Sequence, residues 1–356
     1  MTWPVQLLFR GIERLLGPGA SAFLTAEIGI NHNGDVALAM ECIAAAAESG
    51  ADAVKFQNYR TEDFLNDRSL MYEYVNNGET IHESQFDMFK RCELSFDQLA
   101  ELADYAASKD IIMFSTPSGL DGMREIVELG LPLLKNASDS LTNLVLVRAM
   151  GEAGLPTVFS TGMATVEEID TAVAAFRATG NESLVPTVCT SLYPTPLDLA
   201  HVRRVPALAA RYGLPAGFSD HTDGTLAAIT AVALGACFIE KHFTIDKSLR
   251  GPDHRFSASP QEFAELVKAV RSVEAALGSP ILTPSDDEDE ARRQFGMSLC
   301  AARDLPAGHV IANEDIALFR PGTGLSAQQR NRIIGCTLLR PLARGDQFRL
   351  DIVENS

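Results

Sequence analysis

Eight short apolar runs, each followed by a longer stretch of helical period, constrain the fold of this chain more than any other feature. The runs lie at residues 23–28, 53–57, 111–115, 132–137, 157–160, 187–190, 216–219 and 237–242. The helical patterns lie at residues 36–48, 95–109, 120–129, 144–152, 166–178, 200–212, 226–234 and 260–277. Eight strand–helix units over about 250 residues predict an α/β fold, the (β/α)₈ or TIM barrel. A doubly wound open sheet is the competing layout, but residues 29–34 lack its Gly-rich GxGxxG turn.

Polar side chains stand at the end of nearly every predicted strand, which is where the active site of such a barrel lies. Because side chains alternate along a strand, three pairs of polar residues each share one face of their strand. The pairs are Lys55 with Gln57, Ser219 with His221, and Glu240 with His242. We therefore predict that these side chains meet at the carboxyl-terminal mouth of the barrel.

Two histidines follow or end consecutive predicted strands, namely His221 and His242. A lone histidine is more often a hydrogen-bonded structural residue, but two at neighbouring strand ends can converge on one metal ion. Two neutral imidazoles, with water at the open positions, suit an exchangeable divalent ion. The pair therefore predicts a metal site.

Two lysines, Lys55 and Lys135, end apolar runs of a chain whose net charge is −17. Burying a lysine is costly unless an anion compensates it. We interpret the two as a site for an anionic substrate, with salt-bridged structural lysines as the alternative. The acidic balance argues against nucleic-acid binding, which needs a basic face.

Outside the barrel pattern, the N-terminal residues 3–16 predict a short amphipathic helix on the surface or at an oligomer contact. They lack a basic start followed by an uninterrupted apolar core, so no signal peptide is expected. No run approaches the roughly 20 apolar residues that span a bilayer. The six cysteines are scattered without a CxxC pair, as expected of reduced thiols in a cytoplasmic protein.

Composition divides the chain into four predicted parts. These are an N-terminal extension (1–22), a catalytic barrel (23–278), a solvated acidic linker (279–294) and a small β-rich domain (295–356). Residues 58–93 are too long for a simple connection and predict a lid or a subunit contact. In the last part, residues 303–316 and 339–352 resemble each other, which hints at internal repetition.

The polar strand ends resemble those of the sialic acid synthases, which condense phosphoenolpyruvate with an N-acylated aldose to a nine-carbon 2-keto acid. The matching segments are AEIGINHNG (26–34), AVKFQ (53–57), FSTP (114–117), STGM (160–163), YPTP (193–196), SDHT (219–222), HFT (242–244) and GPD (251–253). The C-terminal part is similar to the antifreeze-like (SAF, β-clip) domain of these enzymes, including RPGTG (320–324).

The resemblance implies a role for each matching residue. His221 and His242 would bind Mn²⁺ or Mg²⁺, and Glu27 would lie beside the metal and its water. Phosphoenolpyruvate would be held by Lys55, Thr116, Lys135, Ser138, Ser160 and Ser219. The sugar would be bound by Gln57, Tyr193 and Asp253, and by Arg320 from the partner subunit of a domain-swapped homodimer.

The chain departs from the family pattern at three places around the predicted site. Residues 137–140 read Ala-Ser-Asp-Ser where Gly-Ser-Gly and an acid are usual. Ser191, which we include among the substrate-binding residues, replaces a frequent Asn, and Lys241 replaces a frequent Arg. These departures bear on which sugar is used more than on the reaction.

The predicted chemistry ends with the addition of water at C2 of the intermediate and the loss of phosphate by C–O cleavage. Glu27 is the candidate base for that water, or else a residue that anchors a hydrogen bond. Asp253 and Glu240 are alternatives for either part. Three other functions stay open: a Schiff-base pyruvate aldolase using Lys135 or Lys55, a non-catalytic sugar-binding protein, and a synthase acting on a phosphorylated aldose.

Overall fold

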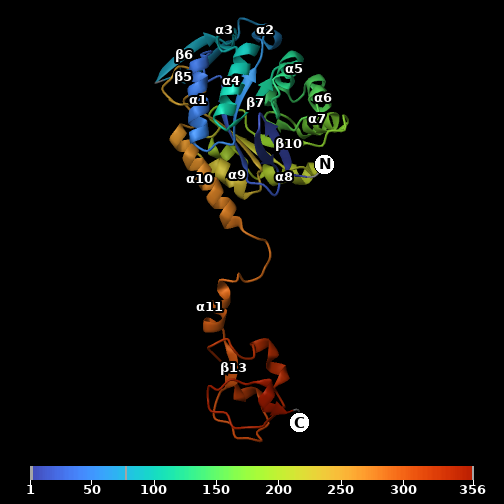
Figure 1. Ribbon diagram of the computed structural model, residues 1–356, viewed down its shortest axis with the longest axis vertical. Helices are drawn as coiled ribbons and strands as arrows, with labels where there is room; N and C mark the ends of the chain where they lie inside the picture. Colours follow the sequence, from blue (N-terminus) through green and yellow to red (C-terminus); the bar gives the residue numbers. More distant parts are fainter. Residues whose placement is uncertain (1–2, 77, 355–356) are drawn as a thin grey trace. The chain divides into compact units, whose positions relative to one another are not determined.

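The computed structural model describes residues 3–76 and 78–354, and the chain divides into two compact units, Met1–Gly278 and Ser279–Ser356 (Figure 1). Each unit has a hydrophobic core of its own. Within the described ranges, no helix combines the length and the apolar character that crossing a membrane requires.

Eight parallel strands of the first unit form a closed barrel, which confirms the predicted TIM barrel. Around the barrel the strands are β3 (Phe23–Gly29), β4 (Ala53–Asn58), β7 (Ile112–Pro117), β8 (Leu134–Asn136), β9 (Thr157–Ser160), β10 (Leu184–Cys189), β11 (Gly217–Asp220) and β12 (Phe238–His242). The main barrel helices are α1 (Val36–Glu48), α4 (Phe96–Ser108), α5 (Leu120–Glu128), α6 (Leu144–Glu152), α7 (Val166–Arg177), α8 (Arg204–Tyr212), α9 (Leu226–Ala233) and α10 (Pro260–Leu277). Figure 1 shows them outside the strands.

Two predicted boundaries were wrong by three residues or more, for local reasons. Strand β10 begins three residues before the predicted start, although Pro186 cannot donate a ladder hydrogen bond and usually argues against a central strand. Helix α8 begins at Arg204 rather than at residue 200, because a 3₁₀ turn at Leu197–Leu199 and the left-handed backbone of His201 precede it.

The N-terminal segment is a β-hairpin, so the predicted amphipathic helix was wrong. Strands β1 (Val5–Phe9) and β2 (Ile12–Leu16) are joined by Arg10 and Gly11, which both have positive φ, as a two-residue hairpin turn requires. Alternate residues of β1 are buried and exposed, a period of two rather than 3.6. The buried side chains join the hydrophobic core of the barrel.

Residues 58–93, between β4 and α4, have secondary structure of their own. They contain α2 (Thr61–Phe64), a hairpin of β5 (Met71–Asn76) and β6 (Glu79–Ser84), and α3 (Gln85–Arg91). A small hydrophobic cluster of Ile30, Tyr59, Met88 and Cys92, separate from the barrel core, holds this segment against the loop after β3.

The second unit contains α11 (Glu288–Phe295), β13 (Ser298–Ala301), β14 (Ile316–Phe319), β15 (Thr337–Leu338) and β16 (Val353–Glu354). Helix α11 begins inside the predicted linker, where acidic residues in its first turn and Arg292 and Arg293 in its last turn complement the helix dipole. The internal repetition suggested by residues 303–316 and 339–352 is also present in the structure. Gly308 and Gly345 both have positive φ, and a three-residue 3₁₀ helix follows each of them.

Candidate active site

A cavity of about 390 Å³ lies among the residues at the carboxyl ends of the barrel strands. Thirteen of the fourteen residues predicted for the site line it. They are Glu27, Lys55, Gln57, Thr116, Lys135, Ser138, Ser160, Ser191, Tyr193, Ser219, His221, His242 and Asp253. The fourteenth, Arg320, belongs to the second unit, where its guanidinium lies 5.3 Å from the centre of the Phe295 ring.

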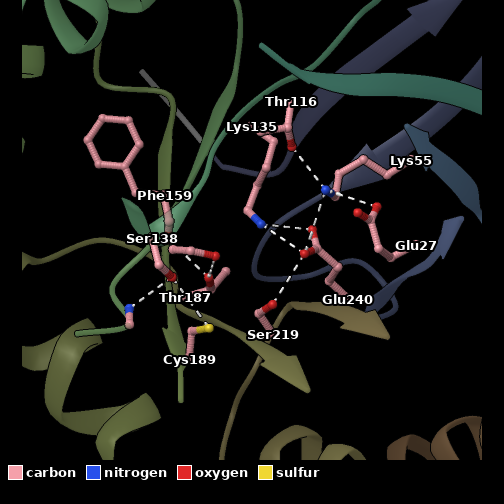
Figure 2. Close-up of polar contacts among 12 residues, drawn as sticks. Glu27, Lys55, Thr116, Lys135, Ser138, Phe159, Thr187, Cys189, Ser219 and Glu240 are labelled. Carbon is pink, nitrogen blue, oxygen red and sulfur yellow. Dashed lines mark hydrogen bonds and ion pairs between the residues drawn. The ribbon is translucent and has the colours of Figure 1, made fainter. Parts of the chain in front are cut away.

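Two buried lysines and two buried glutamates form the floor of the cavity (Figure 2). Lys135 Nζ lies 2.9 Å from both Oε1 and Oε2 of Glu240. Lys55 Nζ lies 2.9 Å from Glu27 Oε2 and 3.9 Å from Glu240 Oε1, and it donates to Thr116 Oγ1 at 2.9 Å. The strand-end lysines therefore meet in one network, and carboxylates of the chain balance their charge.

The network sets the charge state of its members. Burial alone would raise the pKa of Glu240, but the nearby Lys135 and Lys55 outweigh it and lower that pKa to about 2. Burial opposes the charge of Lys55 as well, yet the carboxylates of Glu240 and Glu27 raise its pKa above the ordinary value. Burial raises the pKa of Glu27, against the opposing charge of Lys55, which makes this carboxylate the more basic of the two.

Hydroxyl groups line the side of the cavity formed by β8, β9 and β10. Ser138 Oγ accepts a hydrogen bond from the Gly162 amide at 3.2 Å. A Cβ atom on Gly162 would come within 2.7 Å of Ser138 Oγ and 2.4 Å of Ser191 Oγ, so only glycine allows this approach. The buried Ser191 Oγ has no hydrogen-bond partner among the described residues, which leaves it available to a ligand.

The two predicted metal-binding histidines lie side by side, with ring centres 5.3 Å apart. His221 Nδ1 lies 2.9 Å from the carbonyl oxygen of Thr190. Because a carbonyl only accepts, Nδ1 carries a proton, which leaves Nε2 as the nitrogen with the lone pair in the neutral ring. Burial would lower the pKa of His221, but Cys189, the Thr190 carbonyl and Glu240 outweigh it and raise that pKa above its ordinary value. Burial and the neighbouring positive charges hold the pKa of His242 well below its usual range, so this ring is neutral. Its Nδ1 has no hydrogen-bond partner among the described residues.

The donor set fits a weakly held, exchangeable divalent ion. Within residues 3–76 and 78–354, no three His, Cys, Asp or Glu side chains are arranged to hold a metal. Asp253 Oδ2 approaches His242 Nδ1 only to 3.8 Å, and burial together with the charge of Glu27 raises the pKa of Asp253 to about 7. Two imidazoles would therefore supply the protein ligands, with water or substrate completing the coordination.

A buried ion pair joins the residues that directly precede the two histidines in the chain, Asp220 and Lys241. Lys241 Nζ contacts Asp220 Oδ2 at 2.9 Å and donates to the Thr222 carbonyl at 2.8 Å. Asp220 and Lys241 are register partners of β11 and β12, and both are almost fully buried. Neither lines the cavity, since alternation along the strands turns them away from it. This pair joins the two strand ends that carry His221 and His242.

The sequence prediction missed several cavity residues. Cys189 lies 3.9 Å from His221 Nδ1 and 3.5 Å from Ser138 Oγ. Its place at the carboxyl end of β10 was a usable signal, because the cavity lies at the ends of the strands. Tyr72, Met88 and Phe89 come from residues 58–93 and carried no such signal.

The fold and the cavity define a TIM-barrel protein with an ion-paired floor and two adjacent histidines at its mouth. The chain belongs to the NeuB family, which matches residues 42–281, and residues 296–354 match the SAF domain. It is 38% identical to an N,N'-diacetyllegionaminic acid synthase of Legionella pneumophila, over 95% of this chain and 96% of that protein. It is 31% identical to a pseudaminic acid synthase of Campylobacter jejuni, over 92% and 95% of the two chains.

Among solved structures, the chain is similar to an N-acetylneuraminic acid (sialic acid) synthetase of Leptospira borgpetersenii in complex with citrate. The TM-score is 0.72 and the identity 32%, over 81% of this chain and 95% of that one. The resemblance to the sialic acid synthases and to their antifreeze-like domain is thereby confirmed.

Proposed function

We propose that this chain condenses phosphoenolpyruvate with an N-acylated aldose to give a nine-carbon 2-keto sugar acid and phosphate. The observation that carries the proposal is the meeting of Lys55 and Lys135 with His221 and His242 in one cavity. The names of the related acid synthases support it.

Phosphoenolpyruvate carries a phosphate and a carboxylate, and charge-assisted hydrogen bonds from lysine suit both. Lys55 and Lys135 would hold these groups, and the hydroxyls of Ser138, Ser160 and Ser219 would complete their hydrogen bonds. Ser219 now donates to Glu240 at 3.2 Å, so its hydroxyl can turn to a ligand without leaving the network.

In the reaction, C3 of phosphoenolpyruvate attacks the aldehyde carbon, water adds at C2, and cleavage of the C2–O bond releases phosphate. Glu27 would take the proton of that water, and Gln57 Nε2, which donates to Glu27 Oε1 at 3.1 Å, would hold the carboxylate in place. A divalent ion bound at His221 and His242 would supply Lewis-acid polarisation of the aldehyde oxygen.

Tyr193 and Asp253 would position the aldose beside the histidines. The Tyr193 ring lies 4.3 Å from the His221 ring, centre to centre. Arg320 would contact the acylamino group from the partner subunit of a domain-swapped homodimer. Mixing inactive Arg320→Ala and Lys135→Met protomers tests that arrangement, because a mixed dimer would regain one complete site.

The Schiff-base alternative requires a neutral lysine amine. Lys55 does not meet this condition, since its pKa is raised, and Lys135 makes two contacts with the Glu240 carboxylate. Borohydride treatment with pyruvate should therefore leave no covalent adduct on either lysine.

The direct experiment supplies purified protein with Mn²⁺, phosphoenolpyruvate and a panel of N-acylated aldoses, and measures 2-keto acid and phosphate together. We expect both products in equal amounts with at least one aldose. Lys135→Met should abolish turnover, whereas Lys109→Met should leave it unchanged, because Lys109 is exposed and does not line the cavity. Failure of every aldose would contradict the proposal.

A further inference from the structure

The loop that follows β3, residues 29–34, contains a buried asparagine that does not line the cavity, Asn31. Its Nδ2 atom donates to the carbonyl oxygen of Phe243 at 2.8 Å and to Ser257 Oγ at 2.9 Å. Because a carbonyl oxygen only accepts, the amide nitrogen is the atom that faces Phe243. One amide group therefore holds two positions that lie 212 and 226 residues further along the chain.

The first of these contacts fixes the backbone just beyond β12. Phe243 directly follows His242, the last residue of that strand. The register of β12 with β3 ends at the pair of His242 and Glu27, and Phe243 N donates to the Glu27 carbonyl at 2.7 Å. The Phe243 carbonyl lies beyond this ladder, and the Asn31 side chain supplies its donor. The backbone on the carboxyl side of His242 is therefore held by hydrogen bonds at both of its polar groups.

The second contact reaches the turn that carries Asp253. Ser257 Oγ accepts from Asn31 and donates to the Asp253 carbonyl at 2.6 Å, so the three residues form a chain of hydrogen bonds. Ser257 N donates to the same carbonyl at 3.2 Å. The next residue, Ala258, donates from its amide to the His242 carbonyl at 2.7 Å. The turn with Asp253 and the end of β12 are thus joined to each other and to Asn31.

Complete pairing within the core does not explain the asparagine. Asn31 Oδ1 is buried and has no hydrogen-bond partner among the described residues. A buried polar atom without a partner costs free energy that an apolar side chain would not. The amide is explained instead by its donor half, which makes both of the contacts described above.

From these contacts we propose that Asn31 is a positioning residue, which holds His242 and Asp253 in the relative placement that the reaction needs. It acts through the backbone, by way of Phe243 for His242 and by way of Ser257 for Asp253. In the structure, His242 Nδ1 and Asp253 Oδ2 lie 3.8 Å apart. The inference rests on the proposed function, in which His242 binds the metal ion and Asp253 the aldose.

The test measures three constants in the Asn31→Ala variant. Kd for Mn²⁺, from electron paramagnetic resonance on metal-free protein, should rise by about 10-fold, a usual loss when a group that supports a metal ligand is removed. KM for the aldose at saturating Mn²⁺ should rise by a similar factor. Kd for phosphoenolpyruvate at saturating Mn²⁺ should stay unchanged, because Lys55 and Lys135 lie on β4 and β8.

These constants do not depend on how much of a variant is folded. An unchanged Kd for Mn²⁺ together with an unchanged aldose KM would overturn the inference. Equal weakening of all three constants would also overturn it, because it would show a general loosening of the cavity.

Two further variants sharpen the test. Ser257→Ala removes the contact with Asp253 and keeps the one with Phe243, so it should raise the aldose KM and leave the Kd for Mn²⁺ unchanged. Asn181→Ala is the matched control, because Asn181 is a buried asparagine that donates to the Leu155 carbonyl at 3.0 Å and does not line the cavity. It should lower the midpoint of urea unfolding and change none of the three constants.

The outcomes separate this inference from the proposed function. A raised Kd for Mn²⁺ in Asn181→Ala would show that loss of stability alone weakens the site, and would overturn the role of Asn31. If the unaltered protein turned over no aldose, the proposed function would fail. The Mn²⁺ measurement would then still decide whether Asn31 positions His242.

Discussion

The ammonium group of Lys135, on β8, lies 2.9 Å from each carboxylate oxygen of Glu240, on β12. Lys55 approaches the same carboxylate from the other side (Figure 2). With Glu27 included, two lysines face two glutamates, so the floor carries no excess positive charge. An anionic substrate must share the lysines with these carboxylates, and a metal ion at the histidines would add the missing positive charge.

The first prediction separates binding from stability at this pair. Lys135→Met should destabilise the protein by about 3–5 kcal/mol, because it leaves Glu240 charged and buried without its main partner. The double variant Lys135→Met with Glu240→Gln should regain most of that stability in urea unfolding. Neither variant should bind phosphoenolpyruvate, as measured by calorimetry. Tight binding by the double variant would show that Lys135 does not hold the substrate.

The second prediction concerns the metal. His221→Ala and His242→Ala should each weaken Mn²⁺ binding by 100-fold or more, measured by electron paramagnetic resonance on metal-free protein, because each removes one of two protein ligands. His201→Ala is the control, since this histidine is exposed and lies outside the cavity. Chelation should abolish turnover and added Mn²⁺ restore it. Full activity after chelation would contradict the metal site.

The third prediction addresses the buried Lys241–Asp220 pair. Lys241→Met should cost about 3–5 kcal/mol of unfolding free energy, because Asp220 would remain charged and buried. Lys241→Arg keeps the charge and should cost clearly less. If the pair also holds the two histidines at their separation, Lys241→Met should weaken Mn²⁺ binding in the protein that stays folded. Equal losses for Met and Arg would contradict a role for the charge.

The fourth prediction is a dependence of stability on pH that arises from two buried histidines. Burial lowers the pKa of His32 and of His254 to about 4. Both rings are neutral in the folded state and bind protons more readily when unfolded. Stability is therefore complete above about pH 6.5 and falls toward pH 4, by at most about 1.4 kcal/mol per pH unit for each ring.

Variants at His254 test this dependence. His254 Nδ1 lies 2.7 Å from Thr244 Oγ1, and Nε2 lies 3.3 Å from Asn33 Nδ2. A neutral ring can donate to the hydroxyl and accept from the amide, whereas a protonated ring cannot accept. His254→Gln should reduce the slope of unfolding free energy against pH between 6.5 and 4. An unchanged slope would exclude His254 as a source.

The sequence predicted the barrel well because period and length are local signals. The runs at 157–160 and 237–242 and the helical pattern at 36–48 needed no tertiary information. The hairpin at Val5–Leu16 shows the limit. Its apolar residues fit either period loosely, and the turn at Arg10 and Gly11, where both residues have positive φ, decides for the hairpin.

The residues that line the cavity were predictable where strand ends and family motifs coincide, as at Lys55, His221 and His242. The pairing of Lys135 with Glu240 was not predictable, because the two residues lie 105 positions apart in the sequence. They belong to β8 and β12, which lie opposite each other in the closed barrel. Tyr72, Met88 and Phe89 were also missed, because residues 58–93 reach the cavity through a hydrophobic cluster that no short sequence pattern defines.

The central claim is a condensation in which phosphate leaves from C2 of phosphoenolpyruvate. Phosphoenolpyruvate labelled with ¹⁸O at the bridging oxygen tests it most directly, with the released phosphate and the keto acid analysed by mass spectrometry. The account predicts that the label is found in the phosphate. Label retained in the keto acid would show P–O cleavage and contradict the account.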